Sequence, residues 1–329
     1  MDIKWEDIIG YSEQKKQLQL MLRDSRLPHA LLFAGPAGIG KKRLGRALAA
    51  AILCLNDSLP CGKCDSCRQM VLEQHPDYYE VLPEKRDKSA GIIRIEQIRD
   101  MQLKAGKRPV LATSCVILID DAELMNEAAA NSLLKTLEEP EGNATFILIT
   151  SARSSLLDTI ISRCMLFSFG MLPIDLMQAE LQKRGLAVTE ASKLAALADG
   201  SLGQALNLYE NGGLKLRADA WQILVKLPAF SMEEVWAQTK IMSEFKRDTL
   251  NEWLMYFNML LRDMLILYDD GASTLLYNKD MREELAAILP NYPQNKVWYI
   301  LKEVSELQHR LTANVNLHLQ LEGFFIRIL

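Results

Sequence analysis

The chain has 329 residues, which is enough for two or three domains with well-buried cores. Its net charge of −4 excludes a strongly basic protein that attracts nucleic acid through its overall field, so any DNA contact must be a local patch. The N-terminal sequence lacks the apolar stretch of a signal peptide, and no uncharged apolar run reaches the length of about 18 residues that spans a membrane. We therefore expect a soluble, cytoplasmic protein.

A glycine-rich turn is the first informative motif. An apolar run at residues 29–33, expected to be the first core strand, leads into this turn and then into an amphipathic helix. Gly35, four spacer residues, Gly40 and Lys41 have the spacing of a phosphate-binding loop, whose backbone N–H groups must approach phosphate oxygens closely. Active loops end in a Ser or Thr whose hydroxyl binds Mg²⁺, and Lys42 stands there instead. The loop is suited to a nucleotide such as ATP but compromised for its turnover.

A cysteine cluster follows the helix after this turn. Four of the six cysteines, Cys54, Cys61, Cys64 and Cys67, fall within fourteen residues. Two-residue spacers let neighbouring thiolates converge on one ion, and four sulfurs leave no open coordination position. We therefore expect a structural Zn²⁺ ion, with free thiols or an iron–sulfur cluster as the alternatives. The other two cysteines lie in apolar surroundings and are expected to be inert.

Two acids follow the next strongly apolar segment. Residues 115–119 are typical of a central parallel strand and end in Asp120 and Asp121. A carboxylate at the tip of such a strand lies next to the phosphate loop, where it can hold Mg²⁺. In hydrolytic enzymes of this kind the second acid is Glu, and Asp121 is one methylene shorter. A surface acidic turn is the alternative. A further buried strand, 145–150, ends in the hydroxyl of Thr150 near the same edge.

The order of the remaining elements indicates the fold class. Alternating strands and helices up to residue 170 predict an α/β domain with a mainly parallel sheet. Further strands are expected at 80–83 and 165–169, and helices at 12–23, 92–103 and 126–139, the last one closed by Pro140. Beyond 172–173 the strand-like runs disappear and helices are expected at 174–184, 190–199 and 201–210. After a turn at 211–213 the helices become long and apolar, as in an assembly domain.

These pieces together resemble the clamp-loader branch of the AAA+ ATPases along the whole chain. The most specific strings are LLKTLEEP at 133–140 and Ser162-Arg163-Cys164, supported by HALLF at 29–33 and HPD at 75–77. The resemblance implies three parts. They are a RecA-like P-loop ATPase domain with helices on both faces of its sheet (1–170, with the zinc module inserted at 54–67), a small helical lid domain (171–211) and an all-α collar domain (212–329).

The resemblance also implies partners and roles. Five subunits form a ring through the collar, so the expected partners are gamma/tau motor subunits and a delta subunit. The sliding clamp and primer-template DNA are reached through the complex, at the nucleoid-associated replisome of the bacterial cytoplasm. Arg163 is implied to be an arginine finger that reaches the ATP site of a neighbouring subunit. The implied nucleotide-binding residues are Gly35, Pro36, Gly38, Gly40, Lys41, Lys42, Asp120, Asp121 and Thr150.

Three positions distinguish this chain from the motor subunits of that family. Motor subunits carry Gly-Lys-Thr, Asp-Glu and a lid arginine, and this sequence has Lys42, Asp121 and Gly203 at those places. Because Arg163 remains, the pattern favours a ring member that assists a neighbour and has no ATPase of its own. The alternatives are an active motor subunit of the same complex and, more remotely, a zinc-dependent DNA-binding protein. The acidic pI of about 5.7 argues against the latter.

Overall fold

The computed structural model describes residues 4–56, 59–84, 91–139, 142–210, 212–269, 275–311 and 316–329. They form two compact units, which are Met1–Glu180 with Gly200–Gly203 (unit 1) and Leu181–Asp199 with Gln204–Leu329 (unit 2). The predicted stop at Pro140 and the start of the predicted turn at Asn211 lie outside the described residues, as do residues 85–90 of a charged loop that the sequence predicts at 84–91. The division into three domains at residues 170 and 211 stays a prediction.

Unit 1 is built on a five-stranded sheet in which every neighbouring pair of strands is parallel. Its strands are β1 (Ala30–Ala34), β2 (Tyr78–Val81), β3 (Cys115–Ile119), β4 (Ala144–Thr150) and β5 (Met165–Ser168), in the order β2-β3-β4-β1-β5. Strand β2 begins two residues before the predicted strand because Tyr78 and Tyr79 pair with Val116 and Ile117 of β3. The predicted parallel α/β fold is confirmed.

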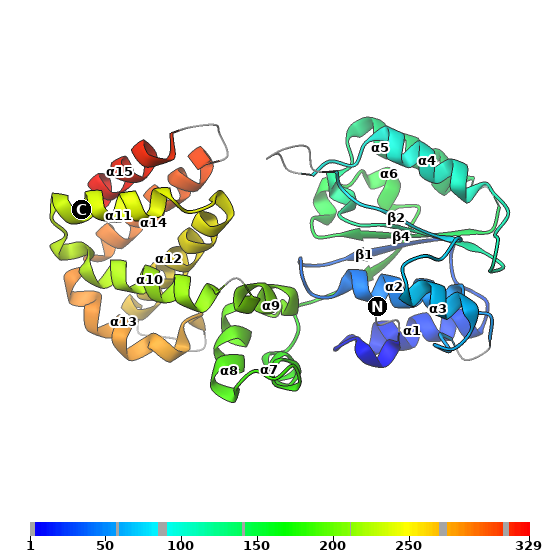
Figure 1. Cartoon of the computed structure of the whole chain (residues 1–329), viewed down its shortest axis with the longest axis horizontal. Helices are drawn as coiled ribbons and strands as arrows, with labels where there is room; N and C mark the ends of the chain where they lie inside the picture. The colour runs from blue at the N-terminus through cyan, green and yellow to red at the C-terminus, as the bar shows by residue number, and fades with distance from the viewer. Residues whose placement is uncertain are drawn as a thin grey trace. The chain divides into compact units, whose positions relative to one another are not determined.

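Helices cover both faces of this sheet (Figure 1). Helices α1 (Ser12–Arg23), α2 (Lys41–Ile52) and α3 (Asp65–Val71) pack on one face, and α4 (Ile95–Ala105), α5 (Glu127–Glu138) and α6 (Asp158–Ile161) pack on the other. Side chains of a strand alternate between faces. Leu31 and Phe33 therefore join the core under α2, while Ala30 and Leu32 join the core under α4 and α5. Short 3-10 helices lie at Trp5–Asp7, Ala122–Leu124 and Arg153–Ser155.

Helix α4 begins later than the sequence predicts. The apolar residues Ile92 and Ile93 suggested a helix from 92, but they form isolated bridges with Glu84 and Met125. Arg94 is the N-cap residue and the helix starts at Ile95. Bridge pairing satisfies the backbone of these two residues and buries Ile93, so tertiary contacts override the local helical pattern.

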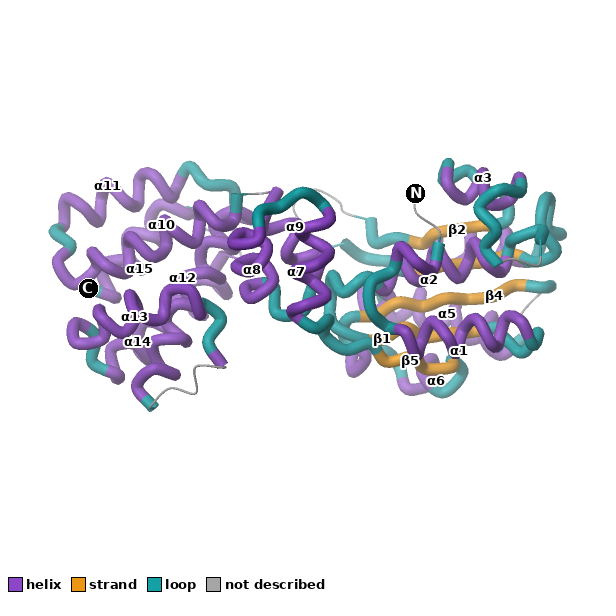
Figure 2. The backbone as a smooth tube through the Cα atoms, turned by 90° about the horizontal axis from the view of Figure 1, so that it is seen from below, coloured by secondary structure: helices purple, strands orange, loops and turns teal. Residues whose placement is uncertain are grey.

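Unit 2 is helical throughout its described part (Figure 2). Its helices are α8 (Val188–Leu197), α10 (Gly213–Lys226), α11 (Met232–Ser243), α12 (Arg247–Tyr268), α13 (Arg282–Ile288), α14 (Gln294–Leu311) and α15 (Leu317–Ile328). Helices α7 (Ile174–Lys183) and α9 (Leu202–Glu210) each begin in unit 1 and end in unit 2. Short 3-10 helices lie at Leu227–Ala229, Lys279–Met281 and Leu289–Asn291. Trp253 and Phe257 of α12 stack in its core with their ring centroids 5.0 Å apart.

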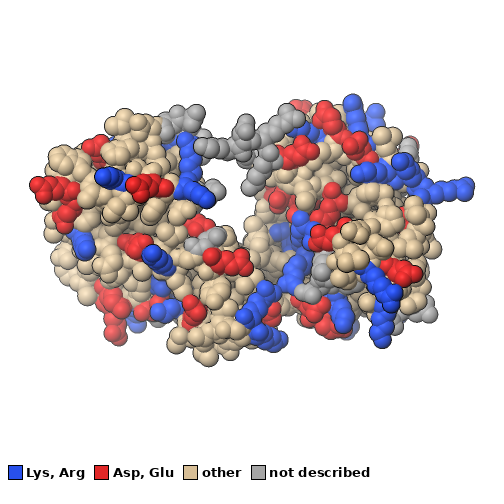
Figure 3. Space-filling model, viewed as in Figure 1, with Lys and Arg blue, Asp and Glu red and all other residues tan. Residues whose placement is uncertain are grey.

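Charges of both signs are mixed on the surface of each unit. On the face shown in Figure 3, Lys and Arg side chains lie among Asp and Glu side chains on both units. Among the described helices, none is both long enough and apolar enough to cross a membrane.

Candidate functional site

The glycine-rich turn joins β1 to α2. A side chain on Gly35 would place its Cβ 2.2 Å from the carbonyl oxygen of Phe169, so close packing requires glycine there. Gly38 and Gly40 have φ angles of +74° and +98°, which L residues with a Cβ rarely adopt. Gly40 is also the N-cap of α2, so the turn leads directly to the positive end of the helix. The structure contains the predicted succession of strand, turn and helix.

Lys41 lies folded over this turn. Its Nζ donates to the carbonyl oxygens of Gly35 and Pro36, both at 2.6 Å, and its side chain is almost fully buried. Burial lowers the pKa of Lys41, and nearby carboxylates, Glu123 foremost, oppose part of that shift. A bound polyphosphate would therefore compete with these carbonyl oxygens for the Lys41 ammonium group, which the phosphate-loop spacing predicts to bind phosphate.

Lys42 takes part in an ion-pair network with two acids. Its Nζ lies 3.1 Å from Oδ2 of Asp120 and 3.5 Å from Oε2 of Glu80. Glu80 also accepts hydrogen bonds from Nε and Nη2 of Arg46 and from the Tyr78 hydroxyl. Burial opposes ionisation of Glu80, but these partners, Arg46 foremost, outweigh it and lower the pKa of the carboxyl group. The acids on the ends of β2 and β3 are thus already neutralised by basic side chains of α2.

Further polar groups meet at the ends of β3 and β4. Asp121 has a left-handed backbone, with φ of +48°, and burial together with the neighbouring carboxylates raises its pKa. Glu123 accepts hydrogen bonds from the backbone N–H of Ser151, at 2.9 Å, and from its hydroxyl group. Thr150 ends β4, and its Oγ1 accepts the N–H of Ala152 at 3.1 Å. Carboxyl ends of parallel strands share one edge of the sheet, which is why these groups converge.

A cavity of about 240 Å³ opens at this edge. Its lining residues are Ala37, Gly38, Gly40, Lys41, Lys42, Arg43, Asp120, Asp121, Ile149 and Ser151. Of the expected nucleotide-binding residues, Gly35 and Pro36 hold Lys41 through their carbonyl groups and Thr150 adjoins Ser151, while the other six line the cavity. The cavity lies where the glycine-rich turn would bind a phosphate chain.

The segment Gly200–Gly203 binds the outer side of the turn. The Ser201 hydroxyl donates to the carbonyl oxygen of Ala37 at 3.0 Å, and the Gly203 N–H donates to that of Gly38 at 2.8 Å. A Cβ on Gly203 would lie 2.9 Å from the same Gly38 oxygen. The position at which the resemblance implies a lid arginine in motor subunits therefore has no room for a side chain unless the backbone moves.

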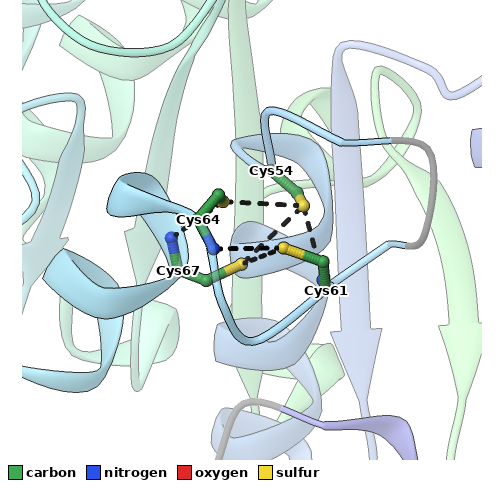
Figure 4. A group of neighbouring side chains, drawn as sticks. All are labelled: Cys54, Cys61, Cys64 and Cys67. Carbon is green, nitrogen blue, oxygen red and sulfur yellow. Dashed lines mark hydrogen bonds between the residues drawn. The ribbon is translucent and has the colours of Figure 1, made fainter.

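The four clustered cysteines converge on one point (Figure 4). Cys54 follows α2, Cys61 lies in the next loop, Cys64 is the N-cap of α3 and Cys67 is in its first turn. Their sulfurs all lie within 4.8 Å of one another, with close pairs at 3.7–3.9 Å. A tetrahedral ion with metal–sulfur bonds near 2.3 Å separates its sulfurs by about 3.8 Å. This arrangement can hold one metal ion.

Backbone N–H groups favour the thiolate form of one cysteine in the cluster. The N–H groups of Lys63 and Cys64 donate to Cys61 Sγ and lower the pKa of that thiol to about 6, which favours the thiolate that a metal binds. Burial raises the pKa values of Cys54 and Cys67, so a bound ion would displace their protons. The donor set fits a thiolate-binding ion with no open position.

The HPD string connects this cluster to the sheet. His75 Nε2 lies 2.9 Å from the Ser66 hydroxyl on α3, and Ser66 donates to the carbonyl oxygen of Leu53. Asp77 accepts three backbone N–H groups from residues 110–112, at 2.6–2.8 Å. Burial opposes ionisation of Asp77, but these donors outweigh it and lower its pKa. The string therefore has two structural contacts: His75 bonds to α3 of the cysteine module, and Asp77 holds the segment before β3.

Arg163 follows α6 and is not among the residues that line the cavity. Its guanidinium pairs with Glu138 on α5 and donates to the carbonyl oxygen of Thr159 at 2.8 Å. A third of its side chain is exposed. An ion pair within its own domain is the alternative role for this arginine, and Glu138 is a partner for that pair.

Sequence reasoning missed four residues of the phosphate site, namely Glu80, Glu123, Ser151 and Ser201. Glu123 was visible as the third acid of the DDAE string, and Ser151 as the neighbour of Thr150. Ser201 was visible in the Gly-Ser string that precedes Gly203, but its contact with the phosphate turn was not. Glu80 gave no local signal because it reaches the site only through the pairing of β2 with β3.

A parallel sheet with a phosphate loop after its first strand, β1, and acids at the end of β3, which β4 separates from β1, defines a protein with the P-loop fold. The family model described as "DNA polymerase III, delta subunit" matches residues 10–173. The chain is 32% identical over 313 residues to DNA polymerase III subunit delta′ of Pseudomonas aeruginosa, covering 91% of each chain. It is 29% identical over 331 residues to the Bacillus subtilis subunit delta′, covering 96% of this chain and 95% of the relative.

A different subunit of DNA polymerase III also matches, over a shorter range. DNA polymerase III subunit tau of Bacillus subtilis is 32% identical over 215 residues, which are 63% of this chain and 37% of the relative. The chain belongs to the family of DNA polymerase III delta′ subunits. The predicted clamp-loader resemblance is confirmed. Matches to delta′ subunits over most of the chain favour this family over the two alternatives, an active motor subunit and a zinc-dependent DNA-binding protein.

Proposed function

We propose that this chain works as the delta′ subunit of a bacterial clamp loader and supplies Arg163 to the ATP site of a neighbouring subunit. In this role it helps to load the sliding clamp onto primed DNA and does not turn over ATP itself. Family membership supports the assembly, and the partners follow from it: gamma/tau and delta subunits in a ring, with clamp and primer-template DNA reached through that ring.

The observation that carries the proposal is the contrast between Arg163 and the chain's own phosphate site. Lys42 is paired with Asp120, Asp121 is a short acid with a raised pKa, and Gly203 leaves no lid arginine. Arg163 lies outside this cavity and is partly exposed. A guanidinium that is absent from its own site but accessible at the surface suits catalysis in a neighbour.

We further propose that the cysteine cluster binds one structural Zn²⁺ ion. Zinc forms tetrahedral thiolate sites with the observed sulfur spacing, and four protein ligands leave no place for substrate. Such an ion would hold the loop between α2 and α3 against the sheet and supply no catalytic step. We propose the bacterial cytoplasm as the location of the protein, because its family belongs to the replication machinery.

The finger can be tested with a pair of variants in the assembled, DNA- and clamp-stimulated complex. Arg163→Ala should lower ATPase by only part of the total, because other interfaces carry their own fingers, and clamp loading should fall further. An arginine finger contributes about 10³–10⁵ in rate at the site it serves. Size-exclusion chromatography verifies that the variant enters the ring.

Glu138→Gln is the matched variant, because Glu138 is the internal partner of Arg163. If Arg163 acts as a finger, Glu138→Gln keeps ATPase at or above the wild-type rate, since the guanidinium is still present and less restrained. If Arg163 only stabilises its own domain, the two variants reduce ATPase equally. Unchanged ATPase and loading in Arg163→Ala would show that the finger assignment is wrong.

A further inference from the structure

Lys42 places a positive charge where a P-loop ATPase binds its metal ion. Active phosphate loops have Ser or Thr at this position, and its hydroxyl binds Mg²⁺. Here the ammonium group lies 3.1 Å from Asp120, the carboxylate at the end of β3 that corresponds to the metal-side acid of this fold. The cation beside that carboxylate is therefore a side chain of the protein itself.

The surroundings fix this arrangement. Glu80, the second acid near Lys42, is held by Arg46 and Tyr78, and the Asp120 N–H donates to the carbonyl oxygen of Val81 at 3.1 Å. The Lys42 side chain is 32% exposed, and those of Asp120 and Glu80 are 16% and 14% exposed. Charges in a half-buried site interact more strongly than they do in water. Lys42 thus pairs with two acids that neighbouring side chains and backbone groups hold in place at this edge of the sheet.

The residues at this point do not fit a Mg²⁺ ion. Mg²⁺ requires oxygen ligands in near-octahedral geometry, and an ammonium group provides no lone pair. A divalent cation at Asp120 would also lie beside the positive charge of Lys42. The cavity retains positive charge for an anion, because Lys41, Lys42, Arg43 and the N-terminal end of α2 line it.

We propose that Lys42 permanently replaces the Mg²⁺ ion, so that the phosphate site takes a nucleoside polyphosphate only as its metal-free anion. Mg²⁺ then lowers the apparent affinity of this chain for ATP and ADP, because it converts the free nucleotide into a complex that the site does not take. The inference deepens the proposed function, since it concerns the same phosphate site, but it is a statement about binding and not about turnover.

Isothermal titration calorimetry on the full chain tests this, with ATP and with ADP, with and without MgCl₂. Buffers are freed of divalent ions by a resin rather than a chelator, so that the ion of the cysteine cluster stays in place. Wild type and Lys42→Arg should bind ATP and ADP more weakly in the MgCl₂ buffer, because Mg²⁺ in solution sequesters the metal-free nucleotide. Lys42→Thr should bind about 10–100-fold more tightly with Mg²⁺, since it restores one ligand to a charged group.

Three comparisons decide the outcome. Wild type that binds ATP about tenfold or more tightly with Mg²⁺ would overturn the inference. Lys42→Thr and its substitute Lys42→Ser, checked for folding by thermal unfolding, would overturn it if neither gained affinity from Mg²⁺. No binding of ATP or ADP by wild type in either buffer would also overturn it. Tight Mg²⁺-dependent binding without turnover would overturn this inference and leave the proposed function standing.

Discussion

The cysteine cluster and the phosphate site lie close together in the sequence but differ in how their polar groups are paired. In the cluster, backbone N–H groups donate to the sulfurs, and these bonds persist when an ion binds. In the phosphate site, the groups that would face a ligand are bound to other parts of the chain: Lys41 to loop carbonyls and Lys42 to Asp120. Buried polar groups must be paired. The cysteine cluster needs a bound ion to complete this pairing, whereas the polar groups of the phosphate site are already paired with other parts of the chain.

The largest effect is expected from Cys64→Ser, which removes one of the four sulfurs. Loss of a metal ligand is among the few substitutions that cost about 3–5 kcal/mol of unfolding free energy. For a domain of this size that lowers the melting temperature by roughly 6–20 °C. Thermal unfolding and elemental analysis measure the two consequences together, and the ATPase of the assembled complex should change less than stability does.

Cys164→Ser is the matched control, because Cys164 is partly buried and lies outside the cluster. It should retain about one zinc per chain and unfold close to the wild-type temperature. Wild-type protein without zinc, or with the visible absorption band of an iron–sulfur cluster, would contradict the zinc assignment.

A smaller loss is expected from Asp77→Asn, which tests the hydrogen bonds between the HPD string and residues 110–112. Asp77 is almost fully buried and accepts three backbone N–H groups, so replacing an acceptor oxygen by an amide nitrogen should cost about 2–4 kcal/mol. Zinc content should remain, since no ligand is changed. Equal stability of Asp77→Asn and wild type would show that these hydrogen bonds do not contribute.

The same carboxylate gives a pH dependence. Its pKa in the folded chain is below the ordinary value of 3.8, so the folded state favours the ionised form. This stabilisation is fully present above about pH 5 and is lost as the pH falls through 3.8 toward the folded pKa. Melting temperatures measured between neutral and acidic pH should therefore decline less steeply for Asp77→Asn than for wild type.

Much of the fold and site was predictable because it depends on local sequence. Continuous apolar runs identify β3 and β4, and fixed spacings identify the phosphate turn and the cysteines. Other features depend on contacts between segments that lie far apart in the sequence. Glu80 reaches Lys42 only because β2 pairs with β3, and Glu138 meets Arg163 only because α5 contacts α6. No periodicity or motif encodes these partners, so only the structure identifies them.

The smallest effect is expected from Gly203→Ala, which examines how tightly the segment 200–203 is held against the phosphate turn. Its Cβ would lie 2.9 Å from the Gly38 oxygen, so the backbone must move and stability should fall by about 1–3 kcal/mol. Gly170→Ala is the control, because no other atom lies within 4 Å of its added Cβ. Identical melting temperatures for the two variants would mean that Gly38 and Gly203 are not in fixed contact.

Whether the phosphate site can turn over ATP is tested most directly by the steady-state ATPase of the isolated chain, compared with that of Lys41→Ala. We expect wild type and Lys41→Ala to give the same background rate, because Lys42, Asp121 and Gly203 remove the metal ligand, the longer acid and the lid arginine. Adding the motor subunit should then produce turnover that depends on Arg163. A steady turnover by the chain alone that Lys41→Ala abolishes would contradict this and show an active motor.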